Sequence, residues 1–244
     1  MSKPSQIRPG AQPFIGQLLA IWKDPGPTSH DIVNAVRRIT GERRVGHAGT
    51  LDPFASGILV IGIGRQATRQ LAQITHSNKE YHAKVHLGAT STTEDRTGAI
   101  TETTSTYEIP TLAQIEAAAA NLRGPIKQRP PAFSAIKVAG RPAYKSARKG
   151  KMLDLGLRDV EIYELEILSY SWPFLDLRTV TSAGTYIRSL ARDLGEALST
   201  GGYLETLERS RIGDWTRAKS LTLQDLQAQV TAHARREANR SETQ

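Results

Sequence analysis

The residues best suited to chemistry lie in one short stretch, Gly46-His47-Ala48-Gly49-Thr50-Leu51-Asp52-Pro53-Phe54-Ala55-Ser56-Gly57. Asp52 is the only acidic residue between Glu42 and Glu80, so no second carboxylate lies near it in the sequence. A lone carboxylate can act as a nucleophile that holds an intermediate, or it can cap a helix. Pro53 disfavours helical backbone at Asp52, and the glycines permit sharp bends. The pattern therefore predicts that the Asp52 carboxylate lies at a bend.

A helix is predicted just before this stretch. Thr28 or Ser29 can accept N–H bonds from its first turn, and Gly41 is placed to end it. Between them, apolar residues recur at helical spacing: Ile32, Val33, Val36 and Ile39. Four basic residues lie around the end of this helix: Arg37, Arg38, Arg43 and Arg44. They form either a solvated face or a phosphate contact, and the pattern alone favours neither.

Alternation of apolar and polar residues predicts a strand over residues 80–88. Tyr81 lies on its apolar face and by itself is typical of a core residue. Three histidines occur nearby: His76, His82 and His86. No carboxylate or cysteine completes a metal-ligand set with them, so a polar outer face is favoured over a metal site. Two more strands are predicted over 160–170 and 174–180, and helices after Thr111 and around Leu190.

Composition indicates the class of partner. The chain of 244 residues has a formal net charge of +8 and a pI of about 9.8, which favours an acidic polymer such as nucleic acid. From Asn121 to Lys151 there are nine Lys or Arg residues and no Asp or Glu, with Phe133 and Tyr144 between them. A basic run with aromatic residues and no acids favours a nucleic-acid contact over a merely solvated face.

The cysteine content and the apolar segments indicate in which cellular compartment the protein is expected. The absence of cysteine excludes disulfides, thiolate zinc sites and a cysteine nucleophile, and it fits a reducing compartment. Phe14 to Trp22 is too short for a signal sequence and lacks a small-residue cleavage site, so a buried strand is predicted there. No apolar run approaches the length needed to span a bilayer. We therefore expect a soluble, cytoplasmic protein without membrane contact.

Residues 15 to 220 resemble the bacterial tRNA pseudouridine synthase B family, because they contain several separate motifs of that family in the same order along the chain. The stretch at 46–57 fills every fixed position of that family's catalytic pattern, Gly-His-x-Gly-x-Leu-Asp-Pro-x-Ala-x-Gly. The other matching segments are Lys23 to Ser29, Lys79 to Tyr81, Pro130 to Tyr144, Gly184 to Arg188 and Gly201 to Arg209. Asp24, Thr92 and Glu208 depart from the family's usual residues.

The resemblance implies roles for individual residues. Asp52 is the implied nucleophile, and Arg188 is its implied partner, which keeps the carboxylate ionised. Tyr81 would stack on the target base, Tyr186 would back the pocket, and Leu207 would pack against the base. The further implied substrate contacts are His47, placed to fill the vacated base stack, Lys23, and the RNA-gripping residues Lys137, Arg141 and Lys145.

The implied fold is a single α+β catalytic domain over residues 14–220, on a long, mainly antiparallel mixed sheet with a basic insertion near 125–151. Residues 1–13 would be a flexible tail. Residues 221–244 would be a partly helical tail, too short for the C-terminal RNA-binding PUA domain of many relatives. The implied reaction converts the T-loop uridine (position 55) of transfer RNA to pseudouridine after base flipping. It gains no atom, so we expect no cofactor or metal, and a monomer that needs no protein partner.

Three other classes of protein are compatible with parts of this sequence. A glycoside hydrolase also uses an aspartate, but it needs a second carboxylate within ~5–10 Å, where the motifs here offer an arginine. A non-catalytic RNA-binding protein would account for the charge but not for an aspartate in a preserved loop. Guide-RNA-dependent pseudouridine synthases share several motifs, but they depend on partner proteins and a PUA domain.

Overall fold

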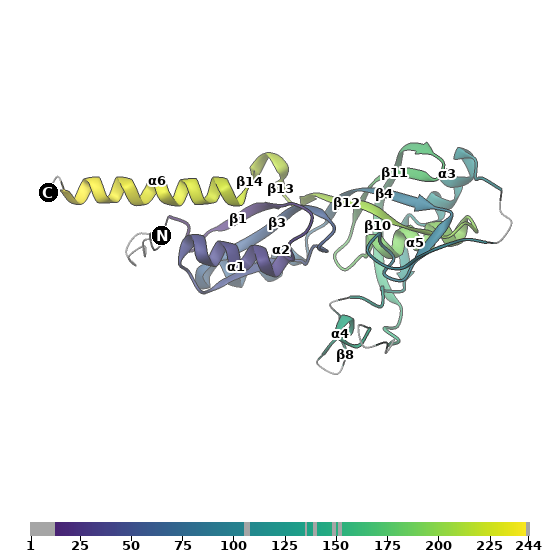
Figure 1. The fold of residues 1–244 in the computed structure, drawn as a ribbon, viewed down its shortest axis with the longest axis horizontal. Helices are drawn as coiled ribbons and strands as arrows, with labels where there is room; N and C mark the ends of the chain where they lie inside the picture. Colours follow the sequence, from purple (N-terminus) through teal and green to yellow (C-terminus); the bar gives the residue numbers. More distant parts are fainter. Residues whose placement is uncertain are drawn as a thin grey trace. The chain divides into compact units, whose positions relative to one another are not determined.

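The computed structural model describes residues 13–104, 108–134, 136–138, 141–147, 150 and 153–242. The chain divides into two compact units, each with its own internal contacts (Figure 1). Unit 1 comprises Met1–Ser77 and Arg209–Gln244, and unit 2 comprises Asn78–Glu208. The predicted tail at 1–13 lies almost entirely outside the described residues.

Among the described residues, unit 1 holds five strands of a ten-stranded mixed sheet. Its strands are β1 (Leu18–Lys23), β2 (Val45–Ala48), β3 (Ser56–Ile63), β13 (Trp215–Thr216) and β14 (Ser220–Leu221), and its helices are α1 (Ser29–Thr40), α2 (Gly64–Thr75), the 3-10 helix η1 (Arg217–Lys219) and α6 (Leu223–Glu242). β3 pairs antiparallel with both β1 and β2, and β14 lies parallel to β1. Alternate residues of β3 face opposite sides of this sheet. Leu59 packs in a core cluster with α1 and α6, whereas Ile58 packs in a second cluster with Leu71 of α2.

The helix predicted before the Asp52 stretch is confirmed. Thr28 is the N-cap of α1: its hydroxyl accepts from the Asp31 backbone N–H, and the Asp31 carboxylate accepts from the Thr28 N–H. Gly41 ends the helix in the left-handed conformation, at φ 71°. The strand predicted from Phe14 begins instead at Leu18, because the preceding residues form a turn in which the Gln17 N–H donates to the Phe14 carbonyl.

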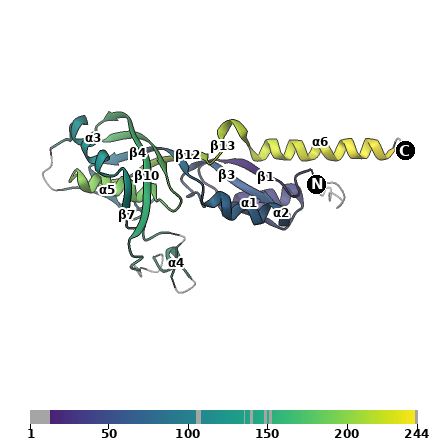
Figure 2. The same ribbon diagram turned by 180° about the vertical axis from the view of Figure 1, so that it is seen from behind.

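Unit 2 holds the other main strands of the ten-stranded sheet, which is twisted (Figure 2). Its main strands, in order across the sheet, are β12 (Gly202–Ile212, in this unit as far as Glu208), β4 (Lys79–Leu87), β11 (Phe174–Thr181), β10 (Arg158–Ser171) and β7 (Gly124–Gln128). The pairs β4–β11, β11–β10 and β10–β7 are antiparallel. The remaining elements are the hairpin β5 (Ala89–Ser91) and β6 (Ile100–Glu102), the pair β8 (Lys137–Val138) and β9 (Arg141–Pro142), and the helices α3 (Leu112–Asn121), α4 (Ala143–Ala147) and α5 (Ile187–Ala197).

The expected mixed α+β architecture with a large, mainly antiparallel mixed sheet is confirmed. On β4, Tyr81, Ala83, Val85 and Leu87 are buried, as their alternation predicts. Thr111 caps α3 with a capping box, and the β10–β11 hairpin turns at a cis Trp172–Pro173 bond. No helix within the described ranges is long and apolar enough to cross a membrane.

Candidate active site

The Asp52 loop, which we define as residues 49–55, connects β2 to β3 in unit 1. Asp52 lies at a bend, as predicted: its carbonyl accepts from the Ala55 N–H at 3.1 Å. Leu51, Phe54 and Ala55 are buried around it, at 3 %, 7 % and 0 % exposure. The loop is thus anchored by apolar side chains while Asp52 itself stays partly exposed.

The side chain of Lys23, at the end of β1, binds the backbone of the Asp52 loop on the C-terminal side of Asp52. Its side chain is fully buried, and its ammonium donates to the carbonyl oxygens of Asp24 (3.0 Å), Pro53 (3.1 Å) and Ala55 (2.6 Å). Burial lowers the pKa of the Lys23 ammonium to about 8, although Asp52 and Asp24 act to raise it. Lys23 therefore fixes the backbone on the C-terminal side of Asp52.

Two further side chains hold the N-terminal side of the loop. The Ser29 hydroxyl donates to the Leu51 carbonyl at 3.0 Å and accepts from the Leu51 N–H at 2.9 Å. Arg209, 1 % exposed, donates from its guanidinium to the carbonyl oxygens of Gly49 (3.1 Å), Thr50 (3.3 Å) and Ile58 (2.9 Å). A Cβ at Gly57 would lie 2.3 Å from the Arg209 carbonyl oxygen, so only glycine fits this crossing.

His47 lies on β2, close to the loop in sequence and half-buried. Burial, with a contribution from Arg209, lowers the pKa of its imidazole below the ordinary value. His47 is therefore neutral at pH 7, which suits a ring that contacts bases rather than phosphates.

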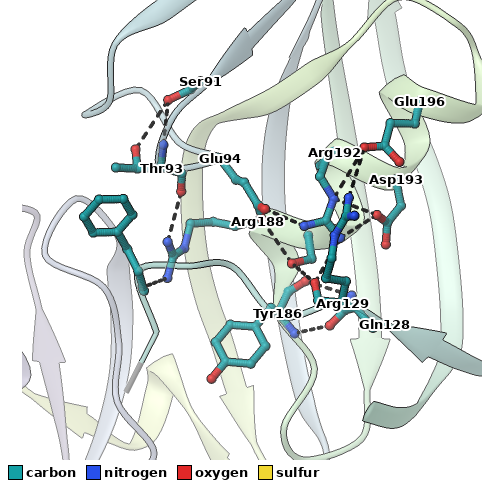
Figure 3. Close-up of polar contacts among 12 residues, drawn as sticks. Ser91, Thr93, Glu94, Gln128, Arg129, Tyr186, Arg188, Arg192, Asp193 and Glu196 are labelled. Carbon is teal, nitrogen blue, oxygen red and sulfur yellow. Dashed lines mark hydrogen bonds and ion pairs between the residues drawn. The ribbon is translucent and has the colours of Figure 1, made fainter. Parts of the chain in front are cut away.

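In unit 2, Arg188 opens α5 with a buried side chain, 4 % exposed. Its guanidinium donates to the carbonyl oxygens of Thr93 and Phe133, each at 3.0 Å, and Figure 3 shows it beside Thr93. It also lies 3.8 Å from an Asp95 carboxylate oxygen. Asp95 is also buried, at 4 % exposure. These contacts fix the orientation of the arginine from two separate segments of the chain, the turn at Thr93–Asp95 and the segment at Phe133.

Asp95 is organised by its own turn. One carboxylate oxygen accepts from the Thr93 hydroxyl (2.8 Å), the Thr97 N–H (2.9 Å) and the Thr97 hydroxyl (2.5 Å). The other oxygen lies toward Arg188. Asp95 is therefore a carboxylate fixed by hydrogen bonds on one oxygen, and its other oxygen helps to position the arginine.

A second network supports the start of α5. The Gln128 side chain bonds both backbone groups of Tyr186: its amide nitrogen donates to the Tyr186 carbonyl (3.1 Å), and its oxygen accepts from the Tyr186 N–H (2.8 Å) (Figure 3). Arg192 contacts Glu94, Asp193 and the Arg129 carbonyl. The backbone that carries Tyr186 and Arg188 is thus held on both sides.

Tyr81 and Leu207 are buried within unit 2, at 6 % and 7 % exposure. Tyr81 is opposite Thr179 in the β4–β11 register. Lys137, Arg141 and Lys145 lie on β8, β9 and α4, and their side chains are outside the described part of the structure. Unit 1 thus holds the predicted site residues Asp52, His47 and Lys23, and unit 2 holds the rest.

The sequence alone did not identify three positioning residues: Ser29, Asp95 and Arg209. The local pattern offers Ser29 only as a helix cap, a role that Thr28 fills. Arg209 had a detectable signal, because it follows Leu207 by two residues and therefore shares its buried face on a strand. Across the described ranges, no group of three or more His, Asp or Glu side chains is arranged to hold a metal ion.

Comparisons with known proteins show which family the chain resembles. Residues 37–187 match the family model described as "TruB family pseudouridylate synthase (N terminal domain)", and residues 188–241 match "tRNA pseudouridylate synthase B C-terminal domain". The tRNA pseudouridine synthase B of Mycobacterium sp. (strain KMS) is 48 % identical over 202 residues, which cover 81 % of this chain and 67 % of that protein. That of Thermobifida fusca (strain YX) is 43 % identical over 222 residues, which cover 88 % and 75 %.

Solved structures share the fold. A Cbf5-Nop10-Gar1 complex contains a chain with a TM-score of 0.67 and 30 % identity, covering 86 % of this chain and 53 % of that one. An H/ACA RNP bound to a substrate RNA containing 2'-deoxyuridine gives a TM-score of 0.65 and 27 % identity, with coverages of 86 % and 52 %. The chain spans about half the length of these solved chains. It belongs to the TruB family of pseudouridylate synthases and is therefore an isomerase.

Proposed function

We propose that this chain converts the T-loop uridine at position 55 of transfer RNA to pseudouridine. The names of its relatives support transfer RNA as the substrate. The observation that carries the proposal is the Asp52 loop, whose backbone is held by the buried side chains of Lys23, Ser29 and Arg209. Such a loop presents one carboxylate in a fixed position, which nucleophilic catalysis requires.

The reaction breaks the N1–C1′ glycosidic bond, turns the base and joins C5 to C1′. Overall, the proton on C5 is lost and N1 gains one, so atoms and electrons balance without a redox partner. Asp52 acts as the nucleophile that holds the intermediate while the base turns. Water would compete for such an intermediate, so the site must exclude it.

The uridine must leave the folded loop before it can react, at a cost of a few kcal/mol. Tyr81 stacks on the flipped base, Leu207 packs against it and Tyr186 backs the pocket. His47, neutral at pH 7, fills the vacated position in the base stack. Arg188, held by the Thr93 and Phe133 carbonyl oxygens and by Asp95, is the basic partner that we assign to the Asp52 carboxylate.

Lys23 has a different role in this proposal from the substrate contact that the motif implies. Its ammonium is buried against three carbonyl oxygens, which supports a positioning role for the Asp52 loop. Phosphate contacts come from the basic run that includes Lys137, Arg141 and Lys145. The protein acts as a monomer in the cytoplasm, without a protein partner, cofactor or metal.

The test uses an unmodified transfer RNA transcript made with uridine tritiated at C5. Because C5 loses its hydrogen, we expect tritium release into water, and mapping should place one pseudouridine at position 55. A transcript with cytidine at position 55 is the matched control and should release nothing. Release from that control, or no release from either transcript, contradicts the proposal.

A further inference from the structure

An unusual concentration of positive charge lies at the end of unit 1 remote from Asp52. We call Arg43, Arg44, Arg65 and Arg69 the arginine cluster; all four are exposed. Backbone contacts hold the segments together: the Gly64 N–H donates to the Arg44 carbonyl at 2.7 Å, and the Val45 N–H donates to the Arg43 carbonyl at 3.1 Å. The segment before β2 and the start of α2 therefore lie side by side, which places these residues at the same end of unit 1.

These arginines are not neutralised by neighbouring acids. Within the described residues, no carboxylate lies within ion-pair distance of any of the four. Glu42, the nearest acid in the sequence, instead accepts a bond from the Arg44 backbone N–H at 2.7 Å. In unit 2, Arg96, Arg129 and Arg178 have carboxylate partners within 4.0 Å, whereas the exposed Arg158 has none among the described residues.

The arrangement is also unfavourable for local stability. Arg65 is in the first turn of α2, where the helix dipole disfavours a cation, and that turn has no acidic residue and no side-chain cap. Arg65 and Arg69 are four residues apart on one helix face, a spacing at which like charges repel. A set of charges that helps neither the helix nor an ion pair is better explained by an anionic ligand.

We propose that the arginine cluster binds RNA backbone phosphates at a distance from the target nucleotide. β3 runs from Ser56, near the Asp52 loop, to Ile63, beside the cluster, and its eight residues span about 23 Å at the usual rise of a strand. A phosphate at the cluster thus belongs to a part of the RNA well outside the nucleotide held at Asp52. The inference rests on the proposed function, because it takes transfer RNA as the ligand.

The experiment compares two RNAs with two triple variants. The test variant is Arg43→Gln, Arg44→Gln, Arg65→Gln. The control variant is Arg235→Gln, Arg236→Gln, Arg240→Gln, which removes the same charge from exposed positions of α6 in the same unit. Dissociation constants are measured across a range of salt for full-length transfer RNA and for an isolated T-arm stem-loop. Binding is read directly, so the result does not depend on turnover.

For full-length transfer RNA, we expect the test variant to bind at least tenfold more weakly at about 0.1 M salt, with the slope of log affinity against log salt smaller by about two to three. The affinity of the test variant for the T-arm stem-loop should differ from that of the wild type by less than about twofold, because the short RNA does not reach the cluster. For either RNA, the salt slope of the control variant should differ from that of the wild type by less than about one. Thermal unfolding should show the test variant to be no less stable than the wild type.

Equal losses in the test and control variants would mean that only net charge matters, and would overturn the proposal. Equal losses on both RNAs would place the contact near the target loop, and would overturn the remote site. A wild-type protein that binds transfer RNA tightly but forms no pseudouridine would contradict the proposed function while leaving this binding result readable.

Discussion

The Lys23 ammonium nitrogen lies 2.6 Å from the carbonyl oxygen of Ala55, and the Lys23 side chain is fully buried. Ala55 is three residues after Asp52, so this contact ties the end of β1 to the loop that carries the carboxylate. A buried ammonium is stable only when its donors are matched by acceptors, and here three carbonyl oxygens surround it. The loop geometry and the charge state of Lys23 are therefore linked.

Lys23→Met is expected to destabilise the protein more at pH 9.5 than at pH 7. In the folded protein the pKa of Lys23 is about 8, below its ordinary value of 10.5. Between these values the unfolded chain binds more protons, so the contribution of Lys23 to the free energy of unfolding rises with pH across this window. Methionine lacks this titration and also leaves three carbonyl oxygens without a donor. Urea unfolding of the wild type and of the Met variant at both pH values measures the difference in their free energies of unfolding. Other titrating groups affect both proteins equally and therefore cancel from this difference. A smaller difference at pH 9.5 would contradict the pKa assignment.

Local patterns predicted the elements around the site well, because caps, turns and alternation depend on neighbouring residues. The α1 cap at Thr28 and the buried face of β4 with Tyr81 are examples. The contacts that hold the Asp52 loop were not predicted, because they join residues far apart in the chain. Ser29 and Leu51 are 22 residues apart, and Arg209 and Gly49 are 160 apart. Alternation predicts which face a side chain takes, but it does not predict which distant carbonyl that side chain meets.

Asp52→Asn should abolish turnover and leave transfer RNA binding within about tenfold of the wild type. The amide is a poor nucleophile, whereas the loss of one negative charge does not weaken phosphate contacts. Tritium release under single-turnover conditions and a filter-binding titration measure the two effects. Residual turnover near the wild-type rate would exclude Asp52 as the nucleophile.

Tyr81→Leu should lose the stacking of the flipped base, worth ~1–3 kcal/mol in binding or turnover. Tyr81→Phe keeps the ring and should therefore keep RNA affinity. The rate of the Phe variant at saturating RNA then separates two roles of the side chain. A rate equal to that of the wild type assigns stacking alone, and a large loss assigns the hydroxyl a part in proton transfer. If Tyr81→Leu reacted as fast as the wild type, Tyr81 would be only a core residue.

Asp95→Asn should lower the free energy of unfolding by about 1–3 kcal/mol, because it removes the carboxylate charge beside the buried Arg188. The amide oxygen can keep the bonds from Thr93 and Thr97, so the turn itself should persist. Asp159→Asn is the matched control, since its ion pair with Lys127 is largely exposed and should be worth less than about 1 kcal/mol. Equal losses in both variants would show that Asp95 does not hold Arg188.

The basic run from Arg123 to Lys151 should supply part of the RNA affinity. Neutralising Lys137, Arg141 and Lys145 together should weaken binding and reduce the salt slope by roughly one for each phosphate that is no longer neutralised. None of the three matches a catalytic motif, so turnover of bound RNA should change much less than affinity. Unlike neutralisation of the arginine cluster, this change should also weaken binding of the isolated T-arm stem-loop, because the run is expected to grip the RNA near the target. Dissociation constants over a range of salt, with both RNAs, measure this. An unchanged slope would mean that the run is only a solvated face, and that Arg37, Arg38, Arg43 and Arg44 must bind the phosphates instead.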